Sequence, residues 1–205
     1  GVPLHVRSSF SSHEGTWVLP SPDDKIKIQE GEPLEQPIIS GVAHDRSEAK
    51  VTVVGVPDIP GKAAEIFGIV AGANSNIDMI VQNVSTQGSG RTDISFTLPI
   101  IDGKEAIDAL NAAKETVGFD SIDYDEQIGK LSLIGAGMRS NPGVSHRFFK
   151  ALHEAGVNID MISTSEIRIS VVTDAKLLDT AVRAVHAAFG LDGDDEATVY
   201  GGTGR

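Results

Sequence analysis

The pentapeptide Asn-Ile-Asp-Met-Ile occurs twice in the chain, at residues 76–80 and 158–162. A Pro-Gly pair precedes each copy, as Pro60-Gly61 and Pro142-Gly143, and both the pair and the pentapeptide recur after 82 residues. An internal repeat constrains the architecture more strongly than any local motif. Two copies are too few for a solenoid, which needs about three or more repeats. The repeat therefore predicts two small domains of the same kind in tandem.

Each copy has the hydrophobic pattern of a small α+β domain. The predicted order is strand, helix, strand, strand, helix, strand, the split βαβ arrangement of ferredoxin-like folds. In the first copy we expect strands at 50–56, 77–84, 92–98 and 122–127 and helices at 62–73 and 103–117, the second helix capped by Asp102 and ended by Gly118. In the second copy we expect strands at 130–136, 159–163, 167–172 and 197–200, with a last helix capped by Asp174 and ended by Gly190.

The first helix has the same apolar face in both copies, so the repeat extends to packing. This face carries Ile66, Phe67, Val70 and Ala73 in the first copy and Phe148, Phe149, Leu152 and Ala155 in the second, again 82 residues later. The first 37 residues differ from the rest, because they hold one short alternating stretch near Leu4 and a polar segment with four prolines. We expect residues 1–37 to be a linker or the end of a larger domain, and residues 201–205 to be a tail.

Composition excludes several classes of partner. The net charge of −12 argues against nucleic acid and against an anionic membrane surface, which both require clustered Lys and Arg. No apolar run reaches the roughly 18–20 residues of a membrane span. The chain has no cysteine, which excludes disulfides and thiol chemistry and fits a cytoplasmic protein.

Signals for catalysis or metal binding are weak. No two of the six histidines have the i, i+4 spacing of a zinc site, and we predict neither a metal nor a cofactor. The segment Gly135-Ala136-Gly137 follows a predicted strand, but Ser140 stands where a dinucleotide-binding loop needs its third glycine. We therefore predict no catalytic residue in this chain.

The loops that lead into the first helix of each copy are better candidates for binding. The N–H groups at a helix start lack acceptors and carry partial positive charge, so they suit a carboxylate, and a nearby Asp can bind an ammonium group. Asp58 and Gly61 are placed this way in the first copy, and Gln82 can reach the same opening from the next strand. The alternative is that Pro-Gly simply turns the chain, that Asn76 and Asn158 are left-handed loop residues, and that Gln82 and Ser165 are solvated.

These motifs together resemble the ACT domain, a regulatory module that binds small molecules, mostly amino acids. The similarity is greatest to the regulatory part of aspartate kinases and covers the chain from about residue 37 onwards. It is carried by Gly41-Val42-Ala43, Ser47-Glu48-Ala49-Lys50, Val81-Gln82-Asn83-Val84-Ser85, Thr92-Asp93-Ile94, Gly135-Ala136-Gly137-Met138 and Ser163-Thr164-Ser165-Glu166-Ile167-Arg168. The resemblance implies two ACT domains, at 38–127 and 128–196, that can be interlocked by strand 197–200 joining the first sheet. Residues 1–37 would then be the remnant of a kinase domain.

The resemblance also implies a function and a set of site residues. The chain looks like a separate regulatory β subunit, which is not an enzyme alone. Such a subunit would form a homodimer and assemble with a catalytic α subunit as α2β2. It would bind threonine, lysine or both, for feedback inhibition of the pathway to lysine, threonine and methionine. One effector site would lie between two chains. One chain would contribute Asp58, Ile59, Pro60, Gly61, Lys62, Ala63 and Gln82, and its partner would contribute Asn158 and Ile159. The pseudo-symmetric site would combine Gly143, Val144, Ser145, Ser165 and Glu166 with Asn76, Ile77 and Asp78. The second helix-entry loop is two residues longer and has Ser140 in place of Asp58, so we expect the two sites to differ.

Two other readings stay open from the sequence. A ferredoxin-like fold can be reused by an enzyme or a metal-binding module, because fold alone does not determine function. The chain could also be a structural dimerisation module whose sites are degenerate. Calorimetry with amino acids separates both readings from an effector-binding domain.

Overall fold

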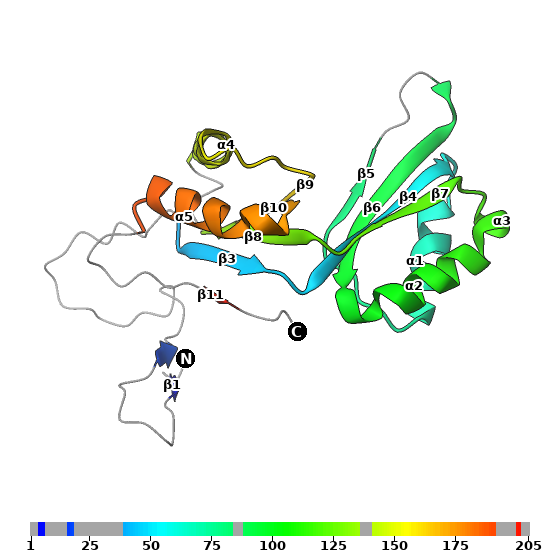
Figure 1. Cartoon of the computed structure of the whole chain (residues 1–205), viewed down its shortest axis with the longest axis horizontal. Helices are drawn as coiled ribbons and strands as arrows, with labels where there is room; N and C mark the ends of the chain where they lie inside the picture. Colours follow the sequence, from blue (N-terminus) through cyan, green and yellow to red (C-terminus); the bar gives the residue numbers. More distant parts are fainter. Residues whose placement is uncertain are drawn as a thin grey trace, which may run out of the picture. The chain divides into compact units, whose positions relative to one another are not determined.

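The computed structural model describes residues 4–6, 16–18, 39–83, 88–135, 141–191 and 200–201. The chain divides into two units, residues 1–35 and 36–205. In the first unit, β1 (Leu4–Val6) pairs antiparallel with β2 (Thr16–Val18). The second unit contains two sheets with their helices (Figure 1) and carries both copies of the repeat.

The first sheet has the order β5-β6-β4-β7 and is antiparallel throughout. Its strands are β4 (Glu48–Pro57), β5 (Ile80–Gln82), β6 (Arg91–Pro99) and β7 (Ser121–Asp125). The helices are α1 (Lys62–Gly72), α2 (Ile100–Ala112) and α3 (Lys114–Val117). Residues of β4 alternate between buried and half-exposed, and the buried ones join Phe96, Ile66 and Leu110 in one core between the sheet and the helices. The predicted split βαβ domain is thus present in the first copy.

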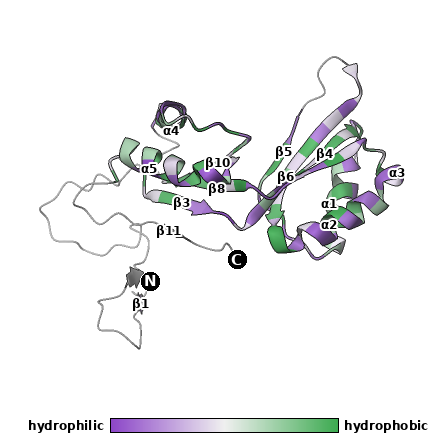
Figure 2. Ribbon diagram, in the orientation of Figure 1, coloured by the Kyte–Doolittle hydropathy of each residue, from purple (hydrophilic) through white to green (hydrophobic). Residues whose placement is uncertain are grey.

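The second sheet has the order β11-β3-β8-β10-β9. Its strands are β3 (Gly41–Asp45), β8 (Ile128–Ile134), β9 (Met161–Thr164), β10 (Arg168–Asp174) and β11 (Tyr200–Gly201). The helices are α4 (Val144–Glu154) and α5 (Leu178–Ala188), with the short 3-10 helix η3 (Ala175–Leu177) before α5. Phe148 and Leu152 of α4 are fully buried in the core of this sheet, as Ile66 and Val70 of α1 are in the first. Figure 2 shows apolar and polar residues alternating along these helices.

The two copies are interlocked, but through a different strand from the one expected. The edge of β8 is paired by β3, which lies before the first copy in the sequence, and β11 pairs parallel with β3. The sequence placed 41–45 in the first domain and left 197–200 either as the last strand of the second copy or as a strand of the first sheet. In the first sheet the edge of β4 is not available to another strand, because β7 already pairs with β4 from Lys50 to Val54. Tyr200 therefore lies in the second sheet, and residues 197–199 lie outside the described residues.

Local signals at the helix ends were partly correct. Asp174 caps η3, since its carboxylate accepts from the Lys176 N–H at 2.8 Å, and Gly118 ends α3 in the left-handed conformation. Asp102 is not an N-cap, because α2 already begins at Ile100, whose N–H donates to the Ser47 carbonyl. The left-handed residues after the first helices are Asn74 and Gly156, not Asn76 and Asn158. In both copies the N–H of the next residue, Ser75 or Val157, donates to the carbonyl five residues earlier, as in a Schellman motif.

Candidate functional site

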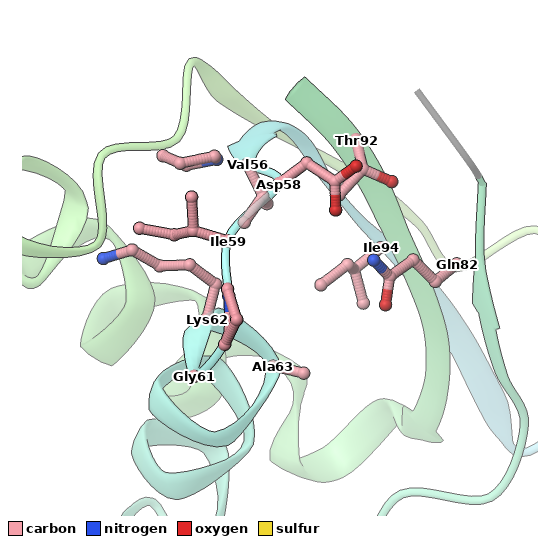
Figure 3. A pocket seen from close by; sticks show the side chains of 11 residues that line it. Val56, Asp58, Ile59, Gly61, Lys62, Ala63, Gln82, Thr92 and Ile94 are labelled. Carbon is pink, nitrogen blue, oxygen red and sulfur yellow. The ribbon is translucent and has the colours of Figure 1, made fainter. Parts of the chain in front are cut away.

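A pocket of about 330 Å³ lies where the end of β4 turns into α1. Figure 3 shows that the loop and the helix start form one side and that β5 and β6 form the other. All seven residues that the sequence proposed for the first-copy half of the site line it. The full lining is Val56, Pro57, Asp58, Ile59, Pro60, Gly61, Lys62, Ala63, Gln82, Thr92 and Ile94.

The backbone of this loop presents donors to the pocket. Gly61 is the N-cap of α1 with φ 100°, a conformation that glycine adopts without strain, and no side chain caps the helix. The first intrahelical hydrogen bond runs from the Glu65 N–H to the Gly61 carbonyl, so the N–H groups before Glu65 have no intrahelical acceptor. That of Lys62 reaches the Ile59 carbonyl only at 3.5 Å. The helix start can therefore accept a carboxylate.

The side chains that point into the pocket add a negative charge and neutral polar groups to the positively polarised N–H groups of the helix start. The carboxylate of Asp58, the hydroxyl of Thr92 and the amide of Gln82 point into the same opening (Figure 3) above buried Val56 and Ile94. Thr92 donates to the Asn83 carbonyl, so its oxygen is left as an acceptor. The Lys62 ammonium pairs with Glu65 at 2.7 Å and extends away from Gln82. The pocket thus combines carboxylate-binding N–H groups with one carboxylate, which complements a zwitterion.

The second copy repeats the helix start but is less fully described. Gly143 is the N-cap of α4 with φ 103°, also without a side-chain cap, and Val144 and Ser145 follow it. Residues 136–140, including the serine that replaces Asp58, lie outside the described residues. Ser165 belongs to the β9–β10 turn, where its N–H donates to the Arg168 carbonyl and its hydroxyl accepts from the Ile167 N–H. Both Ser165 and Glu166 are exposed.

The repeated pentapeptide divides into an exposed half and a half that is used inside the chain. Asn76 and Asn158 are exposed, and Ile77 and Ile159 are half-buried. The next residue forms an ion pair with the other copy in each case: Asp78 with Lys130 of β8 at 2.7 Å, and Asp160 with Lys50 of β4 at 3.9 Å. The following methionines, Met79 and Met161, are buried in one cluster with Ile128, Val172 and Val81. The Asp-Met half therefore joins the two copies to each other.

Lys130 is the centre of the stronger of these contacts. It pairs with Glu48 as well as with Asp78, and only 13 % of its side chain is exposed. Burial lowers the pKa of the Lys130 ammonium, but the hydrogen bonds to Asp78 and Glu48 outweigh it and raise the pKa above 10.5. Lys130 is therefore charged at neutral pH. The Asp78 carboxylate, which the sequence proposed for an effector site, is engaged by this ammonium within the same chain.

Sequence reasoning did not name four of the residues that line the pocket: Val56, Pro57, Thr92 and Ile94. Val56 and Thr92 are direct partners in the β4–β6 ladder, and Ile94 lies two residues further on the same face. The sequence signal for this part of the pocket was Thr92, a polar residue at one of the alternate positions of a predicted strand that are otherwise apolar. Asn158 and Ile159 do not line this pocket in their own chain, as far as the described residues show.

The described residues contain no group of three or more His, Asp or Glu side chains placed to hold a metal ion. Within the same residues, no helix is both long and apolar enough to cross a membrane.

Comparison with known proteins gives the family. The ACT domain family matches residues 51–113 and 131–189. An aspartokinase of Mycolicibacterium smegmatis is 58 % identical over 204 residues, which are 100 % of this chain and 47 % of that protein. An aspartate kinase of Pseudomonas fluorescens is 49 % identical over 193 residues, which are 93 % of this chain and 44 % of that protein. The chain thus spans about half the length of these relatives.

Solved structures agree with the sequence comparison. A chain from a crystal structure of aspartokinase alpha and beta subunits is 45 % identical with a TM-score of 0.69, and the match covers 74 % of this chain and 99 % of that one. The regulatory subunit of aspartate kinase from Thermus thermophilus, in its ligand-free form, is 38 % identical with the same TM-score and the same coverage. The chain therefore belongs to the aspartokinase family, in which it corresponds to the regulatory region built from two ACT domains.

Proposed function

We propose that this chain binds an amino-acid effector in the Asp58–Ala63 pocket and thereby regulates an aspartate kinase. The observation that carries the proposal is the complementarity of the pocket to a zwitterion. The helix-start N–H groups at Gly61, Lys62 and Ala63 bind the α-carboxylate, and Asp58 binds the α-ammonium. The family then supplies the physiological context, in which an end product of the pathway controls its first step.

The pocket is open on one side, and we propose that a second copy of the chain closes it. The partner's Asn158 and the partner's Ile159 cover the ligand, because the same residues are exposed or half-buried and do not line the pocket of their own chain. By pseudo-symmetry, Val144, Ser145, Ser165 and Glu166 face the partner's Asn76 and the partner's Ile77, while Asp78 stays paired with Lys130 of its own chain. A ligand that bridges two chains favours one arrangement of the dimer, and a coupling of about 1–3 kcal/mol gives roughly 5- to 150-fold control.

We propose threonine as the ligand of the first-copy pocket. Gln82 projects an amide over the apolar floor at Ile94, so it can hydrogen-bond to a hydroxyl close to Cα. The floor itself, Val56 and Ile94, suits the methyl group of the same side chain. We assign lysine to the second-copy site, which has Ser140 in place of Asp58. Catalysis is assigned to a separate kinase domain, with which this region assembles as α2β2.

Calorimetry of the folded dimer with threonine, lysine and valine tests this proposal. We expect heat of binding with threonine, and weaker binding of valine, which has the same shape but a methyl in place of the hydroxyl. A site built to hydrogen-bond a hydroxyl discriminates strongly against the analogue that lacks it. No heat with either threonine or lysine would contradict the proposal and would favour a structural dimerisation module.

Gln82→Ala is expected to weaken threonine binding about tenfold, because one hydrogen bond to the ligand is lost. Valine binding should change little, so the preference for threonine over valine should shrink. Gln82 is exposed near the end of β5, and its removal should change the free energy of unfolding by less than about 0.5 kcal/mol. Calorimetry and thermal unfolding measure the two effects. Equal losses of binding and stability would count against the role given to Gln82.

A further inference from the structure

A β-bulge lies in β4 immediately before the pocket. The β4–β6 ladder pairs Val53 with Ile94 and Val56 with Thr92, so Val54 and Gly55 together face the single residue Asp93. Gly55 has φ 68°, in the left-handed region. A bulge of this kind bends the strand and redirects the side chains that follow it.

The bulge decides which side chains reach the pocket. Val51 and Val53 point to the core, so in a regular strand Val56 would point to the opposite face. The extra residue returns Val56 to the core side, where it is fully buried and forms the pocket floor. Asp58, two residues later, follows on the same side and points into the pocket (Figure 3). The position of the ammonium-binding carboxylate therefore depends on the bulge.

Side chains from outside the loop hold both polar groups of Gly55. The Asp93 carboxylate accepts from the Gly55 N–H at 2.8 Å, and the Arg91 guanidinium donates to the Gly55 carbonyl. The same Arg91 nitrogen donates to the Gly118 carbonyl at 2.9 Å and pairs with Asp120 at 3.1 Å. A Cβ on Gly55 would lie 2.0 Å from Oδ2 of Asp120, so another residue would displace this carboxylate, and the φ of 68° also favours glycine.

We propose that Arg91, with Asp93 and Asp120, is a positioning residue for the effector site: it fixes the Gly55 bulge and through it the orientation of Asp58. This inference rests on the proposed function of the pocket. Arg91 and Asp120 are 45 % and 59 % exposed, and an ion pair at such a site contributes little to folding.

The test is Arg91→Met, with Arg46→Met as the matched control. Arg46 is similarly exposed, at 47 %, and also binds a carbonyl, that of Ala175, and a carboxylate, that of Asp179, but it does not line the pocket. We expect Arg91→Met to weaken threonine binding on the order of tenfold with little change in Tm. Arg46→Met should leave the affinity unchanged. An affinity of Arg91→Met equal to that of the wild type would overturn the proposal.

A double-variant cycle shows whether Arg91 acts through Asp58. If it does, Arg91→Met should cost little further affinity when Asp58→Asn is already present, because the carboxylate that Arg91 positions is gone. Fully additive losses would overturn the assignment. The amide resonances of Gly55, Val56, Asp58 and Ile59 in the ligand-free protein give a second readout, and we expect them to shift in Arg91→Met but not in Arg46→Met. Failure of the wild type to bind would refute the effector site, whereas unchanged amides in Arg91→Met would refute the positioning role independently.

Discussion

Lys130→Met should lower the free energy of unfolding by about 2–3 kcal/mol, which corresponds to a fall in Tm of roughly 5–10 °C for a chain of this size. The reason is that Glu48 and Asp78 lose their shared cation while they stay in place. The Glu48 side chain is only 13 % exposed, and its second oxygen is buried without a hydrogen-bond partner among the described residues. Removing one partner of a largely buried ion pair leaves an uncompensated charge, and this costs more than the pair itself contributes.

The control for this prediction is Lys104→Met, which removes a lysine paired with Asp108 on the exposed face of α2. That variant should show no measurable loss of stability. Adding Glu48→Gln to Lys130→Met should recover part of the loss, because it removes the uncompensated carboxylate. Chemical denaturation measures all three variants, and equal stability of Lys130→Met and the wild type would contradict a role for this cluster in joining the two ACT domains.

The stabilisation by Lys130 should also depend on pH, and it should decrease only at high pH. The folded-state pKa of Lys130 is raised above 10.5 by Asp78 and Glu48 in spite of burial. The stabilisation by Lys130 is therefore complete below pH 10.5 and is lost as the pH rises through the folded-state pKa. The difference in stability between the wild type and Lys130→Met should stay constant from neutral pH to about pH 10 and shrink above it.

Asp58→Asn should weaken the binding of threonine by about 10- to 100-fold, the largest effect expected on function. The substitution keeps the shape of the side chain but replaces a charged hydrogen bond to the ammonium group with a neutral one, and charged hydrogen bonds contribute about 1.5–3 kcal/mol. Every α-amino acid carries this ammonium group, so valine should lose affinity by the same factor. Gln82→Ala, in contrast, should affect only the ligand with a hydroxyl.

The matched control for Asp58→Asn is Asp123→Asn, because Asp123 is an exposed acidic residue of β7 that does not line the pocket. Both variants change the net charge from −12 to −11, so a difference between them is not a general electrostatic effect. Asp58 is exposed at the pocket mouth, and Asp58→Asn should leave the Tm within about 2 °C of the wild type. Unchanged threonine affinity in Asp58→Asn would contradict the assignment of the ammonium site.

The repeat in the sequence was sufficient to predict two split βαβ domains, because hydrophobic periodicity and the Pro-Gly turns are local signals. Which sheet a short strand joins is not local. The sequence did not predict a strand at 41–45 and left open which sheet 197–200 joins, whereas in the structure β3 pairs with β8 and β11 pairs with β3. The same limit applies to Asp78, whose partner Lys130 lies 52 residues away in the sequence.

The pocket loop could be predicted from Asp58 to Ala63 because a helix start and a nearby acidic residue are adjacent in the sequence. Thr92 and Ile94 could not be placed, since their contact with Val56 depends on the bulge at Gly55. The two halves of the repeated pentapeptide differ in what they contact. Asp78 and Met79 contact the second copy within the chain, and only the exposed Asn and half-buried Ile are left for a ligand or a partner.

Titration of the ¹⁵N-labelled dimer with threonine tests the central claim most directly, because amide resonances report on hydrogen bonds to a bound carboxylate. The account predicts that the largest shifts occur at the amides of Gly61, Lys62 and Ala63 and at the side-chain amide of Gln82, with further shifts at Asn158 and Ile159 from closure by the partner chain. Saturating threonine that leaves the amides of residues 61–63 unshifted would contradict an effector site at the start of α1.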